Sequence, residues 1–190
     1  MTDNSSEIEL VEQAKTSSEA FGQLYELYFD RVYHFFCYRT CDPDLSYDLA
    51  ALSFEKVMIG LAKYQTQKNV PFSAWLFRLA RNVLIDHSRQ AKKRQYIPLQ
   101  DLPLHSLASN QSTENDIETK LNLDLVKQAI HQMKPKYKEV LLLRFFDQLS
   151  NPEIVAALNK KADQIALYVY RGLENVRQIL SQQIQEVKNG

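Results

Sequence analysis

The segment that decides the fold is VPFSAWLFRLARNVLIDHSRQAKKR, residues 70–94. Pro71 has a fixed backbone angle that suits the first position of a helix. After it, apolar side chains recur at three- and four-residue spacings, at Phe72, Trp75, Leu76, Leu79 and Val83. This period is typical of a helix that packs one stripe of side chains against other helices. We expect Trp75 to belong to that packed stripe.

A second face of the same predicted helix is basic. Residues 71–94 hold six Lys or Arg and one Asp, whereas the whole chain has 23 basic and 23 acidic residues. The residues that share the polar arc are Arg78, Arg81, Asn82, Arg89 and Lys92. A local net charge of +5 in a neutral chain favours a polyanionic partner over the alternative, a solvated face on an ordinary core helix.

The composition predicts an all-α protein. Hydrophobic residues make up 45% of the 190 residues and charged ones 24%, which is enough apolar material for a core. There are only four glycines, and long helical periods dominate. The first residues show no signal peptide, and no apolar run is long enough for a membrane span. We therefore expect a cytoplasmic protein without membrane insertion.

The only two cysteines give a weak metal signal. Cys37 and Cys41 form H-x2-C-x3-C with His34, but the pattern lacks a fourth ligand and matches no strong zinc signature. We interpret the cysteines as packed thiols and expect no metal or cofactor. The chain also lacks a phosphate-cradling glycine loop, a paired-carboxylate motif and a nucleophile signature, so we expect no enzyme activity.

Capping signals divide the chain into helices. A capping box from Thr16 to Glu19 opens a helix that lasts to about Thr40. Asp42, followed by Pro43, predicts the start of the next helix, and a polar loop at 64–69 leads to the basic helix.

The periodicity fails between residues 95 and 113, where two prolines and several serines lie. Such a stretch is unusual inside a compact domain, so we predict two small helical domains, residues 1–94 and 114–190, joined by a flexible linker, residues 95–113.

The second domain carries a predicted helix-turn-helix. One helix begins near residue 113, and Pro135 opens the next. A capping box from Ser150 to Glu153 starts a short helix, which Asn159 can end in a left-handed conformation. A long final helix follows from about Ala162, in the position of a helix that lies in a DNA major groove.

Two of these segments resemble one family. WLFRLARNVLIDHSRQAKKR resembles the promoter-melting segment of the extracytoplasmic-function sigma factors of bacterial RNA polymerase, and MKPKYKEVLLLRFFDQLSNPEIVAAL resembles the start of their promoter-binding C-terminal domain. The similarity covers roughly residues 20–180. It implies a sigma factor that directs core RNA polymerase to promoter DNA and helps to melt it. An anti-sigma factor or another protein is a further candidate partner.

The resemblance and the charge pattern assign candidate contact residues. For polymerase binding the resemblance implies Asp48, Ala51, Leu52, Phe54 and Lys56. For DNA binding we add to the basic helix the loop residues Lys63, Tyr64 and Lys68, and the helix-turn-helix residues Lys160, Lys161, Gln164, Tyr168 and Arg171. Ala51 and Leu52 replace a polar Gln-Glu pair that is usual in the family.

The final helix also departs from the family, because Ala166, Leu167, Tyr168 and Leu173 stand where basic residues are usual. We expect Leu167 and Tyr168 to be exposed beside one Arg, Arg171, a face suited to a protein partner more than to duplex DNA. The alternative function is therefore a degenerate sigma-like module that regulates transcription through protein contacts without initiating it.

Overall fold

The computed structural model describes residues 4–65, 70–94, 126, 128–130 and 132–189. Their helices are α1 (Asn4–Gln13), α2 (Ser18–Thr40), α3 (Pro43–Leu61), α4 (Phe72–Arg94), α6 (Pro135–Leu141), α7 (Asn151–Leu158) and α8 (Ala162–Asn189), with a π-helical turn η1 (Leu142–Phe146) after α6. No described segment is a β-strand, so the all-α prediction is confirmed. None of the described helices is both long and apolar enough to cross a membrane.

Side-chain caps set most of the helix ends. Asp42 accepts a hydrogen bond from the Leu45 amide at 3.0 Å, and Ser150 and Glu153 form the reciprocal capping box. Asn159 ends α7 with φ 51° and ψ 51°, as predicted. One cap differs by a residue: Ser17, and not Thr16, is the N-cap of α2 and accepts from the Ala20 amide.

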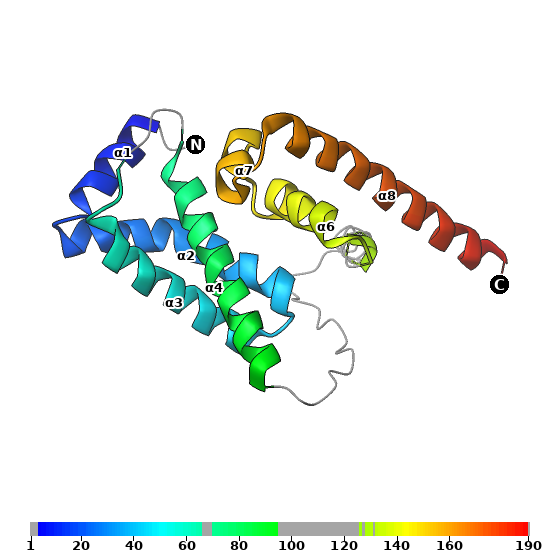
Figure 1. Ribbon diagram of the computed structural model, residues 1–190, viewed down its shortest axis with the longest axis horizontal. Helices are drawn as coiled ribbons and strands as arrows, with labels where there is room; N and C mark the ends of the chain where they lie inside the picture. Colours follow the sequence, from blue (N-terminus) through cyan, green and yellow to red (C-terminus); the bar gives the residue numbers. More distant parts are fainter. Residues whose placement is uncertain (1–3, 66–69, 95–125, 127, 131, 190) are drawn as a thin grey trace, which may run out of the picture.

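In the N-terminal unit, defined here as the described residues from 4 to 94, α2, α3 and α4 pack together (Figure 1). Their shared core is rich in aromatic side chains. Phe35 and Phe77 are buried there with their ring centroids 5.7 Å apart. Trp75 is half-buried, and its ring lies 4.9 Å from that of Tyr64. A side chain at Gly60 would meet this indole at 3.2 Å, so glycine there lets α3 and α4 approach closely.

The C-terminal unit, defined here as the described residues from 126 to 189, contains the predicted helix-turn-helix, α7 and α8. Figure 1 shows α8 extending well beyond the other helices toward the C-terminus. The π-helical turn η1 was not predicted, because the sequence reads as a continuation of the helix from Pro135. Phe145 in this turn is exposed, with 54% of its surface accessible.

The two units pack directly on each other. One hydrophobic cluster contains buried residues of both, including Phe77 and Val83 on one side and Leu143, Leu149 and Ile154 on the other. Helix α7 lies along α4, and η1 contacts α2. The boundaries of the two domains stay a prediction, since residues 95–113 and most of the helix expected before residue 130 lie outside the described residues.

Polar contacts join the units as well. Arg39 of α2 forms an ion pair with Asp147 at 3.0 Å, and both side chains are buried. Arg31 donates to the Asp147 carbonyl oxygen at 3.0 Å. On α4, Arg81 Nε donates to Glu139 Oε1 at 2.6 Å, and the Ser73 hydroxyl group donates to Glu153.

This shared core predicts how a nicked chain behaves. If residues 95–113 are an accessible linker, brief proteolysis should cut there and leave two helical fragments. Because both contribute to one buried cluster, the fragments should elute together from a sizing column near the position of the 22.1 kDa chain. Separate elution of the two fragments in native buffer would contradict the packing described here.

Candidate nucleic-acid interface

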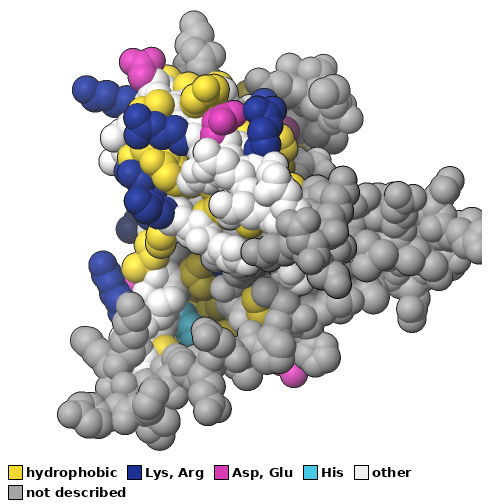
Figure 2. Space-filling model, turned by 90° about the vertical axis from the view of Figure 1, so that its right-hand side faces the viewer, with side chains coloured by type: hydrophobic (Ala, Val, Ile, Leu, Met, Phe, Trp, Pro, Cys, Tyr) yellow, Lys and Arg dark blue, Asp and Glu magenta, His cyan; other side chains and the backbone are white. Residues whose placement is uncertain are grey.

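The basic face of α4 (Arg78, Arg81, Asn82, Arg89 and Lys92) lies on the outside of the N-terminal unit for most of its length. Arg78, Asn82 and Arg89 are exposed, and Arg81 is half-buried in its ion pair. The helix includes Lys92, but the side chain of this residue lies outside the described part. Figure 2 shows Lys and Arg side chains along one edge of the molecule, interleaved with hydrophobic ones.

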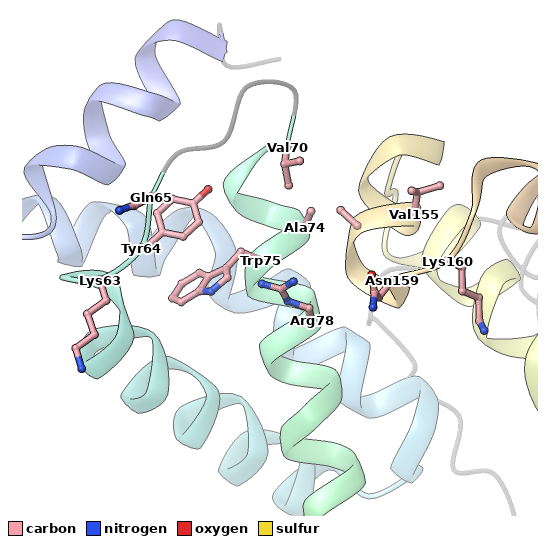
Figure 3. Close-up of a pocket in the computed structure, with 11 residues that line it drawn as sticks. Lys63, Tyr64, Gln65, Val70, Ala74, Trp75, Arg78, Val155, Asn159 and Lys160 are labelled. Carbon is pink, nitrogen blue, oxygen red and sulfur yellow. The ribbon is translucent and has the colours of Figure 1, made fainter.

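A crevice of about 550 Å³ opens where the loop after α3 meets α4 and α7 (Figure 3). Its lining residues are Lys63, Tyr64, Gln65, Val70, Ala74, Trp75, Arg78, Val155, Ala156, Asn159 and Lys160. They include three cations and no carboxylate, so the lining is electropositive. In Figure 3 the rings of Tyr64 and Trp75 lie next to each other on the side of the N-terminal unit, and Asn159 and Lys160 come from the other side.

The chemistry of this crevice suits a strand with phosphates and bases. Cations neutralise phosphate oxygens, and aromatic rings stack on unpaired bases. Burial raises the pKa of Tyr64, with a smaller contribution from Glu7 and Glu12, so its phenol remains a neutral hydrogen-bond donor.

The structure thus brings together residues that were predicted from separate segments. Lys63, Tyr64, Arg78 and Lys160 share the crevice. Arg89 lies three turns further along α4, roughly 16 Å from Arg78 at 1.5 Å per residue, and so does not join them. Lys68 lies outside the described residues.

The helix-turn-helix residues divide into two sets. Lys160, Lys161 and Gln164 border a hollow of about 570 Å³ at the turn between α7 and α8, together with Leu167. Arg171 lies elsewhere, beside Tyr137 of α6, and its guanidinium group lowers the pKa of that phenol.

Tyr168 is not the exposed side chain that the sequence suggested. It is half-buried, and its ring packs edge-on against Tyr137, with centroids 5.7 Å apart. The exposed aromatic of α8 is Tyr170, with 66% of its surface accessible, followed by the exposed Leu173. Leu167 is exposed as predicted. The three-residue spacing of Leu167, Tyr170 and Leu173 is the sequence pattern from which this exposed apolar stripe could have been predicted.

A basic cluster on α6 was missed by the sequence reasoning. The Lys136 ammonium group lies 4.9 Å from the Tyr137 ring centroid and 5.6 Å from that of Tyr168. Hydrogen bonds from Arg171, and then from Lys136, lower the pKa of Tyr137. Lys136 and Arg171 are thus two cations that lie beside the same tyrosine side chain, Tyr137. Among the described residues, no carboxylate forms an ion pair with either. The K-P-K-Y-K run was the sequence signal for it.

The candidate polymerase residues lie on α3. Asp48, Ala51, Leu52 and Lys56 are exposed. Phe54 is not: only 3% of its surface is accessible, and its ring packs on Tyr25 at 4.8 Å. It therefore holds α3 in place and cannot contact a partner. The exposed apolar residues of this helix include Tyr47, Met58 and Ile59, which the sequence reasoning did not select.

The cysteine pattern forms part of α2 and its C-cap. Cys37 is buried and Cys41 half-buried, both as free thiols, and burial raises the pKa of Cys41. The His34 ring nitrogen Nδ1 is hydrogen bonded to the Asp30 carbonyl oxygen at 2.7 Å. In the described part of the chain, no group of three His, Cys, Asp or Glu is placed to hold a metal ion.

Comparison with known proteins defines the class. Sigma-70 region 2 matches residues 24–94, and sigma-70 region 4 matches residues 123–176. These are the two units described above, in the order found in sigma factors that consist of two helical regions.

The particular family follows from the relatives. The ECF RNA polymerase sigma factor BldN of Streptomyces coelicolor is 29% identical over 182 residues, which cover 94% of this chain and 67% of BldN. SigW of Bacillus subtilis is 27% identical over 174 residues, covering 87% of this chain and 91% of SigW. The chain belongs to the extracytoplasmic-function (ECF) sigma factors.

Two solved structures share the fold. CnrH, in complex with the cytosolic domain of CnrY, superposes with a TM-score of 0.68 at 20% identity, over 95% of this chain and 99% of CnrH. RpoE of Bartonella quintana, in complex with the anti-sigma factor NepR, gives a TM-score of 0.67 at 18% identity, over 85% of this chain and 96% of RpoE. These likenesses confirm the arrangement of helices.

The buried position of Phe54 leads to a stability prediction. Phe54→Ala should lower the free energy of unfolding by about 3–5 kcal/mol, because it removes a ring from a packed aromatic cluster. The neighbouring exposed change Leu52→Ala should stay within about 0.5 kcal/mol of wild type. Denaturant unfolding followed by circular dichroism measures both values. Equal losses in the two variants would mean that Phe54 does not occupy this core.

Proposed function

We propose that this protein is an RNA polymerase sigma factor that binds core polymerase, directs it to promoters and helps to open promoter DNA. The observation that supports this most is the order of two sigma regions along one chain, with a basic helix and an aromatic crevice in the first. The described residues of the site offer groups that bind phosphates and bases, and we assign the chemistry of transcription to the polymerase. The protein acts in the cytoplasm, where the polymerase works.

Promoter melting is assigned to α4 and the crevice beside it. Arg78 and Arg89 contact the phosphate backbone, and Arg81 joins them when it is released from Glu139. Bases that leave the duplex stack against the aromatic wall formed by Tyr64 and Trp75. An enzyme or factor that opens DNA must compensate the lost base stacking, and each base that stacks on an aromatic ring contributes about 1–3 kcal/mol.

Polymerase binding is assigned to the outward face of α3. Acidic Asp48 and Glu55 flank exposed Leu52, Met58 and Ile59 on this helix. An apolar centre with charged neighbours is the usual composition of a protein interface. Ala51 and Leu52, in place of the polar pair usual in the family, make this face more apolar while leaving it exposed.

The C-terminal unit contacts the upstream promoter duplex through a small number of charges. Lys160 and Lys161 at the turn, and the Lys136–Arg171 pair where α6 meets α8, are the cations that we assign to this contact. Phosphate contacts fix the register on the duplex, whereas base contacts give the specificity. Because α8 exposes Leu167 and Tyr170 in place of basic residues, this unit has few side chains that can contact bases. Its discrimination between promoter sequences therefore depends on a small number of base contacts.

The exposed apolar residues of α8 also suit a protein partner. CnrH and RpoE were each solved with a bound partner, the cytosolic domain of CnrY and the anti-sigma factor NepR. An anti-sigma factor is therefore the partner class that we propose for this chain. The alternative of a module that no longer initiates transcription is not favoured, because the relatives are named sigma factors.

The basic face of α4 predicts a salt-dependent interaction. Binding of promoter DNA should weaken with salt at a log–log slope of about −0.7 to −0.9 for each phosphate contact. Arg78→Glu combined with Arg89→Glu should weaken binding and flatten this slope, since both side chains are exposed and their loss leaves the core intact. A matched control is Lys15→Glu with Arg177→Glu, which changes the net charge equally at positions outside the face. Equal affinities of the two double variants would refute the assignment.

Initiation itself is tested with the whole machinery. Core polymerase that lacks other sigma factors should produce a run-off transcript from a promoter of the host only when this protein is added. The Arg78→Glu, Arg89→Glu variant should still bind core polymerase, because α3 is unchanged, but should yield less transcript. Binding to polymerase without any transcript from the wild-type protein would instead support the non-initiating alternative.

A further inference from the structure

We propose that two copies of this chain associate through the outward face of α8, in an antiparallel pair whose two-fold axis passes beside Tyr170. The inference goes beyond the proposed function and does not depend on it, because it rests on the residue pattern and the exposure of one helix. The partner that it assigns to this face is a second copy of the same chain.

The outward face of α8 is apolar at its centre. Leu167 has 42% of its surface accessible, Tyr170 has 66% and Leu173 has 47%. At about 100° per residue, the three side chains lie within about 60° of the direction of Tyr170. Three large apolar side chains in one exposed stripe are typical of a surface that another protein covers.

The opposite face of α8 packs inside the C-terminal unit. Ile165 is fully buried, and a side chain at Gly172 would meet Leu141 of α6 at 3.0 Å. In Figure 1, α8 runs along the edge of this unit, and α6 lies on one side of it. The face that carries Tyr170 is therefore the one that points away from α6.

The two ends of the apolar stripe carry opposite charges. Asp163 lies about two turns before Tyr170, and Arg177 lies about two turns after it on the same face. Both are exposed, and 78% of the Arg177 side chain is accessible. Arg177 Nη1 donates to Glu174 at 3.1 Å within the helix, and its guanidinium group has further donors for a second carboxylate.

The order of these residues is symmetric about Tyr170. In an antiparallel pair centred there, each position after Tyr170 lies level with the position equally far before it in the second copy. Leu173 then lies level with Leu167 of the second copy, and Arg177 lies level with Asp163 of the second copy. Because the axis is two-fold, each contact occurs twice. The pair has leucines on both sides of two central tyrosines and an ion pair at each end.

The charges favour a second copy in the antiparallel direction. In a parallel pair Asp163 would lie level with Asp163 of the second copy, and Arg177 with Arg177, so like charges would repel at both ends. In the antiparallel pair no two charges of the same sign lie level between residues 163 and 177. A surface that is complementary to itself is the requirement for an interface with two-fold symmetry.

The size of this face sets the expected affinity. The segment 163–177 is about 21 Å long at 1.5 Å per residue, so each copy contributes a smaller surface than a standard protein interface. We therefore expect a weak dimer with a dissociation constant of about 10–100 μM.

The first test measures the mass of the full-length chain as a function of its concentration. In sedimentation equilibrium from about 2 to about 200 μM, the mass should rise from 22.1 kDa toward twice that value. Tyr170→Glu puts two carboxylates at the two-fold axis and should raise the dissociation constant at least about 10-fold. The matched control is Tyr47→Glu on α3, an exposed tyrosine outside α8, which should leave the dissociation constant unchanged. A wild-type chain that stays monomeric over this range, or equal weakening by both changes, overturns the proposal.

The second test exchanges the charges at the ends of the stripe. Asp163→Arg alone and Arg177→Asp alone should each weaken the dimer at least about 10-fold, because each change leaves like charges level at both ends. A one-to-one mixture of the two variants should recover a dissociation constant within about threefold of wild type, since each end then joins opposite charges. An effect inside one helix cannot produce this recovery, because each chain in the mixture keeps its own substitution.

The direction of the pair is tested by placing both changes in one chain. Asp163→Arg with Arg177→Asp restores opposite charges in the antiparallel pair and should dimerise like wild type. Retained helical circular dichroism shows that the variants fold. Single variants that dimerise as well as wild type, or a mixture and a doubly changed chain that both stay monomeric, would overturn the antiparallel contact through α8.

Discussion

The arrangement of the whole molecule depends on one buried ion pair, because Arg39 and Asp147 are the charged groups that both units bury at their contact. The π-helical turn η1 makes this possible. It ends with the Asp147 amide bonded to the Leu142 carbonyl oxygen at 3.0 Å, and the left-handed Gln148, with φ 57°, then turns the chain so that Leu149 enters the core. A regular α-helix through this segment would place Asp147 at a different angle around the helix axis, because its hydrogen bonds span four residues and not five. The unusual turn and the unusual buried charge are therefore two parts of one arrangement.

The zero net charge of the chain is reflected in this interface, where acidic residues of the C-terminal unit pair with basic residues of the N-terminal unit. Glu139 partly compensates the basic surplus of the α4 segment through its ion pair with Arg81, and Asp147 pairs in the same interface with Arg39 of α2. A polyanion that binds α4 at Arg81 competes with Glu139 for this side chain. A chain with no net charge can still bind DNA, because binding depends on the electrostatic field of the exposed face and not on the net charge. Carboxylates that pair with basic residues inside the molecule reduce the positive charge that this face presents.

The parts of the fold that the sequence predicted are those fixed by interactions over a few residues. Asp42 with Pro43, the Ser150–Glu153 box and Asn159 each act through a backbone group within three or four positions, so the pattern and the structure agree. The ion pair joins residues 108 positions apart, and no local period indicates it. The predictions that Phe54 and Tyr168 face a partner were wrong for a related reason. The apolar arc of a helix is wide, and the helices that pack against it decide which aromatic side chain at its edge is buried.

The two departures from the family pattern acquire a physical meaning in the structure. Ala51 and Leu52 enlarge an apolar surface on α3 that already includes Met58 and Ile59, so the helix keeps the character of a binding face although it loses polar groups. On α8 the missing basic residues are partly replaced from another helix, since Lys136 of α6 lies beside Arg171 through their shared contact with Tyr137. The C-terminal unit therefore keeps a route to phosphate through this pair. Leu167 and Tyr170 remain exposed on the same helix, and Leu167 lies four residues, about one turn, before Arg171, so apolar and basic side chains share this surface.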